Sequence, residues 1–383
     1  MFPVEIHGTR APHRLALNRG AILCRIDPKI GVDAGTGEKD TFPIIFYRRR
    51  LVMAINWPER LSLAHTPTPL YQLSRLSEDL GVPLYVKRDD LTGVELSGNK
   101  VRKLEFLVAE AMNAGADTLV TCGGVQSNHC RATAAAAIRA GLQCHLILRG
   151  EEPALPYDGN LLLDRLMGAT VSFLPQPEYE KGENEDFAGI LEALRKKDQK
   201  PFYIPVGGSV PTGCWGYARA FEELTDQLRA RSIRRARLVS AIGSGGTHAG
   251  LLFGRAMLER KNYTVTGFNV CNTPELFKEK SRKLVAKAAE NAGLDIALAE
   301  EDLDVIGGYV GPGYAQPYPE LMETIRDVAR TEALILDPVY TGKAFHGLLC
   351  EIRAGRIRKD EPIVFIHTGG AFGLFPQREH IVY

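Results

Sequence analysis

The most constraining feature of the sequence is a regular alternation of short apolar runs with amphipathic stretches, from about residue 60 onwards. The apolar runs predict strands at 84–86, 118–121, 144–148, 171–173, 201–206, 238–242, 264–271 and 362–367. The stretches between them predict helices at 99–114, 127–140, 160–167 and 215–229. Such alternation is typical of parallel sheets with helices on both faces. We therefore expect an α/β fold.

Composition narrows the class of protein. The chain has 383 residues, which favours two core-bearing units or one large α/β body. Its 47 basic and 46 acidic side chains give a net charge of +1, which provides no field for nucleic acid. The seven cysteines contain no C-x-x-C pair, and a reducing cytoplasm suits such a set. No run approaches the roughly 20 apolar residues of a membrane span, so we expect no membrane partner.

Residues 1–55 differ from the rest of the chain, because they show turns and a basic cluster, Arg48-Arg49-Arg50, without sustained periodicity. We expect an N-terminal extension that is disordered, or that reflects a start codon chosen upstream of Met53. A transit peptide is the alternative. Its usual scarcity of acidic residues fits poorly with the five acids between Glu5 and Asp40.

The first chemical motif is the stretch from Ser97 to Glu105, in which a small-residue turn leads Lys100 into the first turn of a helix. A helix N-terminus disfavours a cation by about 0.3–1 kcal/mol, so the pKa of Lys100 is expected to fall. An amine with a lowered pKa is a better nucleophile towards an aldehyde. A solvated surface lysine is the alternative interpretation.

The second motif runs from Gly243 to Gly250, between a predicted strand and a predicted helix. Unpaired backbone N–H groups at such a helix start form a cradle for an anion. A dinucleotide fingerprint would need a glycine where His248 stands and an acid after the next strand. No lysine follows the glycines as in a nucleoside-triphosphate loop. The pattern therefore favours a lone phosphate, with an empty βα turn as the alternative.

The third motif is another strand-to-helix turn, from Gly123 to His129. Ser127 either caps the helix or faces a substrate, and Asn128 is suited to bind a ring hydroxyl. The adjacent pairs His129-Cys130 and Cys144-His145 lack the gap that lets two metal ligands converge. We expect no metal site.

Together these segments resemble the D-cysteine desulfhydrase and 1-aminocyclopropane-1-carboxylate deaminase family of pyridoxal-phosphate enzymes. The resemblance covers residues 58–378. It rests on seven ordered segments, which are Leu63–Leu70, Val86–Asp90, Ser97–Glu105, Gly123–Asn128, Gly243–Gly250, Asp337–Lys343 and His367–Gly370. It implies two open twisted sheets with flanking helices, the type II pyridoxal-phosphate fold of tryptophan synthase β.

The resemblance also implies roles for individual residues. Lys100 is expected to form the Schiff base with pyridoxal 5'-phosphate, and Asn128 to face the phenolic oxygen of the cofactor. The phosphate is expected to bind the backbone N–H groups of Ser244, Gly245, Gly246 and Thr247. The substrate is expected to lie among Gln126, Ser127, Asn128, Tyr314 and Tyr340, with Ser127 and the two tyrosines sharing the proton chemistry of Lys100. Core packing with a satisfied hydroxyl is the alternative for both tyrosines.

The residue after Tyr340 separates activities within this family. The deaminases resemble one another in carrying a glutamate there, facing the pyridine nitrogen, whereas this chain has Thr341. By resemblance to the desulfhydrases, Thr368 supplies a hydroxyl to that nitrogen. A hydroxyl does not keep the ring nitrogen protonated, so the electron sink is weaker. A weaker sink suffices when a thiol leaves.

The expected activity is therefore a carbon–sulfur lyase that converts D-cysteine to pyruvate, hydrogen sulfide and ammonia. Alternatives on the same scaffold are a cyclopropane deaminase, an L-cysteate sulfolyase and a D-serine lyase or racemase. A non-catalytic cofactor-binding protein and a dehydrogenase are the alternatives of other classes. We expect a homodimer with a large domain formed by 56–102 and 213–383, a small domain formed by 103–212, and the cofactor in the cleft between them.

Overall fold

The computed structural model of the chain describes residues 55–381. The predicted N-terminal extension, residues 1–55, lies outside the described residues except for Ile55. Asn56 begins the compact unit that holds every helix and strand described below. No helix of the described part is long and apolar enough to cross a membrane.

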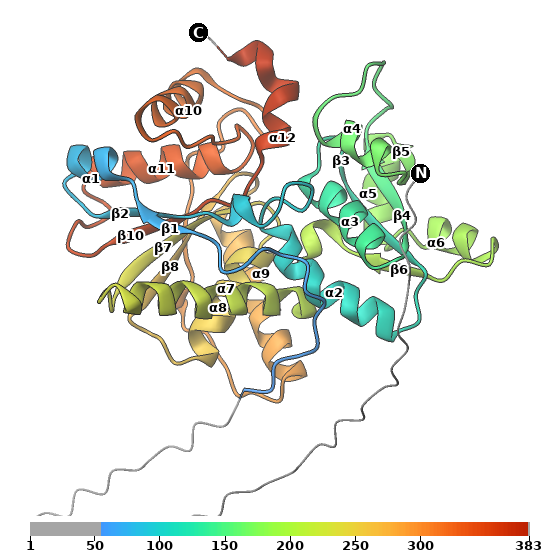
Figure 1. Cartoon of the computed structure of the whole chain (residues 1–383), viewed down its shortest axis with the longest axis horizontal. Helices are drawn as coiled ribbons and strands as arrows, with labels where there is room; N and C mark the ends of the chain where they lie inside the picture. Colours follow the sequence, from blue (N-terminus) through green and yellow to red (C-terminus); the bar gives the residue numbers. More distant parts are fainter. Residues whose placement is uncertain (1–54, 382–383) are drawn as a thin grey trace, which may run out of the picture. The chain divides into compact units, whose positions relative to one another are not determined.

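A four-stranded parallel sheet occupies the middle of the sequence, in the order β5-β4-β3-β6. Its strands are β3 (Thr118–Gly124), β4 (Gln143–Arg149), β5 (Thr170–Leu174) and β6 (Pro201–Ile204). Its helices are α3 (Asn128–Arg139), α4 (Gly159–Leu166), α5 (Gln176–Asn184) and α6 (Ala188–Arg195), which lie around the sheet in Figure 1. Alanines of α3 pack into the core on one face, where their small side chains let the helix approach closely.

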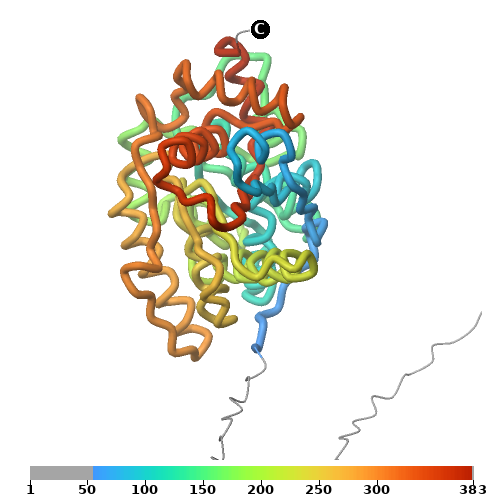
Figure 2. Tube along the Cα trace, turned by 90° about the vertical axis from the view of Figure 1, so that its left-hand side faces the viewer, coloured from blue at the N-terminus to red at the C-terminus, as the bar shows by residue number. Residues whose placement is uncertain are grey.

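A six-stranded sheet takes strands from both ends of the described chain, in the order β1-β2-β10-β7-β8-β9. Its strands are β1 (Leu70–Gln72), β2 (Leu84–Lys87), β7 (Ala236–Ile242), β8 (Tyr263–Asn269), β9 (Asp304–Ile306) and β10 (Ile363–Ile366). Only β1 runs antiparallel to its neighbour. The blue and red segments that lie side by side in Figure 2 reflect the pairing of β2 with β10.

Helices cover both faces of this larger sheet (Figure 1). One face carries α7 (Pro211–Ala230), α8 (Gly246–Met257) and α9 (Pro274–Asn291), and the other carries α1 (Ser74–Leu80), α10 (Pro319–Glu332) and α11 (Thr341–Arg353). A short helix, α12 (Ala371–Leu374), follows β10. All four residues of β10 are buried, as expected for a strand covered on both faces. The prediction of an α/β fold with two sheets and flanking helices is confirmed.

Helix α2 (Lys100–Asn113) joins the two parts, because it packs against α3 on one side and α7 on the other. Its buried positions include charged residues as well as apolar ones. Arg102 donates from Nε and Nη2 to the carboxylate of Asp89, at 2.9 and 2.8 Å, and Glu105 accepts from the backbone N–H groups of Leu63 and Ala64. These bonds fix the helix at both faces, so the position of its first residue is determined by tertiary contacts.

Several element limits differ from the sequence prediction. The helix expected at 215–229 begins at Pro211, since proline suits the first helical turn. The strand expected at 201–206 ends at Ile204, because Val206–Gly208 forms a 3₁₀ turn in which Gly207 has φ of 68°. The edge strands β1 and β9 were not predicted, since each has only three residues and hence no measurable period.

Candidate active site

A cavity of about 380 Å³ lies at the carboxyl ends of β3 and β7, with walls from both sheets. Ligands of open parallel sheets bind at this edge, because the connecting loops and helix N-termini meet there. Among the residues singled out from the sequence, those that line it are Lys100, Ser127, Asn128, Ser244, Gly245, Thr247, Tyr314, Tyr340 and Thr368. Gln126 and Gly246 do not line it.

Lys100 is the first residue of α2 and points into the cavity. Its Nζ donates a 2.8 Å hydrogen bond to Asn99 Oδ1 and lies 5.9 Å from the centre of the Tyr340 ring. Burial lowers the pKa of Lys100 to about 8; the negative charge of Asp337 raises it and the positive charge of Arg131 lowers it further. The amine is therefore far more often uncharged at neutral pH than a free lysine.

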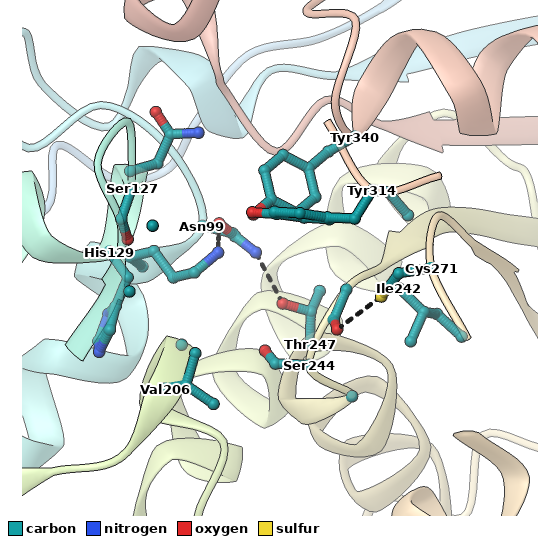
Figure 3. Close-up of a pocket in the computed structure, with 18 of the residues that line it drawn as sticks. Asn99, Ser127, His129, Val206, Ile242, Ser244, Thr247, Cys271, Tyr314 and Tyr340 are labelled. Carbon is teal, nitrogen blue, oxygen red and sulfur yellow. Dashed lines mark hydrogen bonds between the residues drawn. The ribbon is translucent and has the colours of Figure 1, made fainter. Parts of the chain in front are cut away.

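Asn99 connects the lysine to the glycine turn. Its Oδ1 accepts from Lys100, and its Nδ2 donates a 2.8 Å bond to Thr247 Oγ1, as the dashed lines in Figure 3 show. The side chain is only 8% exposed. Because both ends of the amide have partners, Asn99 holds Lys100 at a fixed place relative to α8.

The turn at 243–247 joins β7 to α8 and has Gly245 in the left-handed region, at φ of 95°. A Cβ on Gly243 would lie 2.8 Å from the Tyr340 ring, and one on Gly246 would lie 2.6 Å from Ser209 Oγ. The backbone thus approaches its neighbours too closely for any side chain. The Gly246 N–H, which was expected to bind the phosphate, donates to Ser209 Oγ at 3.1 Å instead, and Gly246 does not line the cavity.

Two buried groups beside this turn were not identified from the sequence. The Nζ of Lys103 donates to Gly207 O at 3.1 Å and lies 2.9 Å from the place of a Gly246 Cβ. Burial and the charge of Lys100 lower the pKa of Lys103 well below its usual value. His129 is 3% exposed and neither ring nitrogen has a partner. In the sequence, only proximity to predicted site residues points to these two groups. Lys103 stands three residues after Lys100, and His129 directly follows Asn128.

These two groups test whether an anion fits the cavity. Within residues 55–381 no carboxylate lies in ion-pair distance of Lys103. The charged form of a buried amine is costly without a counter-ion, which is why the pKa of Lys103 is lowered, and a phosphate in the glycine turn would supply that counter-ion. The donor set therefore fits a phosphate ester, and Lys100 provides an amine on the same cavity.

Two tyrosines form one wall. The hydroxyls of Tyr314 and Tyr340 share a hydrogen bond, and their rings meet edge to face with centroids 5.9 Å apart (Figure 3). Burial raises the pKa of Tyr340 well above its usual value, and the neighbouring Tyr314 raises it further. Asp337 accepts from the backbone N–H groups of Val339 and Tyr340, both at 2.9 Å. The two tyrosines are thus protonated at neutral pH, and Asp337 fixes the backbone that carries Tyr340.

The two threonines singled out from the sequence have different surroundings. Thr341 is fully buried; its hydroxyl donates to Asp337 Oδ1 at 2.6 Å and accepts from the Asp337 N–H at 2.9 Å. It does not line the cavity. Thr368 follows β10 and does line it, while its carbonyl accepts from the Asn99 N–H at 3.1 Å.

The turn after β3 contributes Ser127 and Asn128. Ser127 Oγ accepts the N–H of Cys130 at 3.2 Å, so the capping interaction is present, and the side chain also borders the cavity. The Gln126 side chain is engaged away from the cavity, where its Oε1 accepts from the Asn160 N–H and its Nε2 donates to Asp158 O. No group of three or more His, Cys, Asp or Glu side chains arranged for a metal occurs in the part of the chain that the structure describes.

Comparison with known proteins identifies the class. A family model described as pyridoxal-phosphate dependent enzyme matches residues 61–369, which is most of the chain. The chain therefore belongs to the pyridoxal-phosphate dependent enzyme family, and its cofactor is pyridoxal phosphate. Solved structures with 16–19% identity, among them an L-serine ammonia-lyase from Rhizomucor miehei at a TM-score of 0.58 and 17% identity, share the fold.

More similar proteins specify the branch of this family. A bifunctional D-cysteine desulfhydrase/1-aminocyclopropane-1-carboxylate deaminase of Arabidopsis thaliana is 44% identical over 324 residues, covering 82% of this chain and 79% of its own. A D-cysteine desulfhydrase of Salmonella typhi is 39% identical over 327 residues, covering 84% and 97%. The crystal structure of an ACC deaminase homologue has a TM-score of 0.76 and 37% identity, and covers 85% of this chain and 95% of its own. The resemblance inferred from the sequence motifs is confirmed.

Proposed function

We propose that this enzyme is a D-cysteine desulfhydrase that converts D-cysteine and water to pyruvate, hydrogen sulfide and ammonia. The observation that carries the proposal is the amine of Lys100, whose pKa is lowered, on one cavity with the glycine turn at 243–247 and the tyrosine pair. The Arabidopsis and Salmonella relatives, named as desulfhydrases, support the choice of substrate.

The residues that would hold the cofactor follow from the donor set. Lys100 would bond to the aldehyde, and the turn at Ser244, Gly245 and Thr247 would take the phosphate. Lys103 does not line the cavity, but its amine lies beside this turn, where the phosphate would favour its charged form. Asn128 and Thr368 would face the ring oxygen and the ring nitrogen. When bound, pyridoxal phosphate supplies an electron sink that acidifies the α-proton of an amino acid.

Side chains of the enzyme would carry out the proton transfers. The Lys100 amine lines the cavity, and its lowered pKa would suit it to remove the α-proton of the substrate. The C–S bond then breaks, the electron pair leaves with sulfur, and the sulfur takes up a proton. Tyr340 and Tyr314 line the cavity, and their hydroxyls share a hydrogen bond. Both phenols are protonated at neutral pH, so one of them could pass that proton to the sulfur while the other holds it in place. The released aminoacrylate adds water and loses ammonia.

The threonines favour the desulfhydrase over the deaminase. The buried hydroxyl of Thr341 is bound to Asp337 and has no access to the cavity, and Thr368 offers only a hydroxyl there. Without a carboxylate against the ring nitrogen the electron sink is weaker. Release of a thiol demands less of that sink than opening an unactivated ring.

The two sheets support a division of residues 56–383 into a large domain, 56–102 with 213–383, and a small domain, 103–212. Each sheet has its own apolar core, one around β2, β7 and β10 and one around β3 and β4. We also propose a homodimer in the cytoplasm with a small amino acid as substrate. Sedimentation analysis of the purified chain tests the dimer.

A substrate panel tests the activity. Purified enzyme is given D-cysteine, L-cysteine, D-serine and L-cysteate, with pyruvate measured, and aminocyclopropane carboxylate, with 2-oxobutyrate measured. The expected result is pyruvate and sulfide in equal amounts from D-cysteine at the highest kcat/KM, and loss of turnover in Lys100→Ala. Faster release of 2-oxobutyrate would refute the choice of substrate, and absence of turnover with all five would indicate a non-catalytic binding protein.

A further inference from the structure

A buried polar network behind the cavity wall links three segments that are distant in sequence. Its centre is Asn160, which is fully buried on α4. Asn160 Oδ1 accepts from Arg131 Nε at 2.7 Å. Its Nδ2 donates to Asn128 Oδ1 at 3.1 Å and to Gln126 O at 3.0 Å. Every polar atom of the Asn160 side chain therefore has a partner.

Arg131 fixes the direction of this network. Its guanidinium is fully buried, donates from Nη2 to Ser97 O at 2.8 Å and from Nη1 to Glu95 O, and lies 5.0 Å from the centre of the Phe372 ring. Its two backbone acceptors, Glu95 O and Ser97 O, therefore belong to the loop that precedes Lys100. An arginine can donate and cannot accept, so the atom of Asn160 that faces it must be the oxygen.

The orientation of Asn160 in turn determines the orientation of the Asn128 amide. With its oxygen on Arg131, Asn160 presents its NH₂ group to Asn128, so Asn128 must turn its own oxygen towards Asn160. The Nδ2 of Asn128 is left without a partner among the described residues, on a side chain that lines the cavity. The relay thus leaves a hydrogen-bond donor free for the cavity and turns the acceptor away from it.

We propose that Arg131 and Asn160 are positioning residues, which orient the Asn128 amide so that a donor meets the negatively charged ring oxygen of the bound cofactor. If the Asn128 amide were reversed, Asn128 Oδ1 would face the negatively charged ring oxygen of the cofactor, and the two oxygens would repel each other. The proposal rests on pyridoxal phosphate being bound in this cavity and not on which amino acid is its substrate. It extends the binding site to two residues that touch neither cofactor nor substrate.

The deciding variant is Asn160→Asp. An aspartate keeps the size of the side chain and the acceptor for Arg131, but it has no NH₂ group. Asn128 would then turn its own NH₂ towards the aspartate and its oxygen towards the cofactor. Equilibrium dialysis of the full chain against pyridoxal phosphate is expected to show roughly tenfold weaker binding. The pH midpoint of the visible band of the holoenzyme should rise by roughly one unit, since the anionic ring oxygen loses its donor.

Asn160→Ala separates this role from a structural one. It lets Asn128 turn either way, so cofactor binding should weaken less than in Asn160→Asp, although the apoprotein loses more stability because Arg131 loses a partner. A structural role predicts the opposite order, since aspartate is the closer match in shape. Asp158→Asn is the matched control, because Asp158 lies two residues before Asn160 on the chain. This variant removes the ion pair between Asp158 and Arg378 and keeps the oxygen that accepts from the Gly159 N–H. It should leave both readouts unchanged.

A double-mutant cycle completes the test. In an Asn128→Ala background, neither Asn160→Asp nor Asn160→Ala should change cofactor affinity or the pH midpoint further. The proposal is overturned if the Asn160 variants act equally with and without Asn128, or if Asn160→Ala binds the cofactor more weakly than Asn160→Asp. Circular dichroism establishes that each variant is folded, and if the aspartate variant is not, the alanine cycle alone decides.

Discussion

The lowered pKa of Lys100 leads to a quantitative prediction about how the apoprotein captures its cofactor. Only the uncharged amine attacks an aldehyde. With a pKa of about 8 instead of 10.5, the uncharged fraction at pH 7 rises from ~0.03% to ~9%, which is roughly 300-fold. Burial is the main cause, with a smaller contribution from Arg131 and an opposing one from Asp337.

The assay is stopped-flow mixing of full-length apoprotein with pyridoxal phosphate between pH 6 and pH 10, followed at the visible band of the bound cofactor. The second-order rate constant reports the free protein. It should rise about tenfold from pH 6 to pH 7 and level off above pH 9, because Lys100 is then largely uncharged. The same reaction with N-acetyl-lysine provides the reference, since its amine keeps an ordinary pKa and its profile contains the pH dependence of the aldehyde.

The reasoning is refuted if the protein follows the N-acetyl-lysine profile up to pH 10, since Lys100 would then have an ordinary pKa. Lys100→Arg is the control for the identity of the amine. It keeps a cation at the start of α2 and should give no visible band at any pH, because a guanidinium does not attack the aldehyde.

Three further outcomes are expected. Lys103→Met should raise the thermal stability of the apoprotein, because a buried amine whose only hydrogen-bond partner is Gly207 O is replaced by an apolar side chain, and should weaken cofactor binding at least tenfold by dialysis. Equal affinity would exclude a phosphate contact. Tyr340→Phe should lower kcat about 100-fold and leave cofactor affinity within a few-fold, as measured by steady-state kinetics and dialysis. Asp89→Ala should lower the free energy of unfolding in urea by about 3–5 kcal/mol, because Arg102 is left buried and without its main partner; a loss below 1 kcal/mol would contradict this.

The sequence motifs predicted the parts of the site that depend on neighbouring residues. A lysine one residue after Asn99 at a helix start and a glycine run after a strand are local patterns, and both lie on the cavity. The departure at Thr341 could also be read directly. The sequence did not show that Thr341 is turned away from the cofactor site: its hydroxyl binds Asp337 and does not line the cavity.

Other parts of the site had no local signal. Ser209 meets the glycine turn from another loop, 37 residues away from Gly246. Lys103 reads as an ordinary charged residue of an amphipathic helix until α2 is packed on both sides. Its burial, and hence its lowered pKa, follows from that packing.

The sequence by itself determined the alternation of strands and helices, the position of the amine at a helix start and the family of enzymes. These depend on residue type and short-range spacing, which the chain carries whether or not it is folded. Only the tertiary structure decided which amides are buried and how they are oriented. The Arg131–Asn160–Asn128 relay joins residues about 30 positions apart in the sequence. The orientation of each amide is fixed only in the folded interior, because water is excluded there and each donor must pair with a specific acceptor.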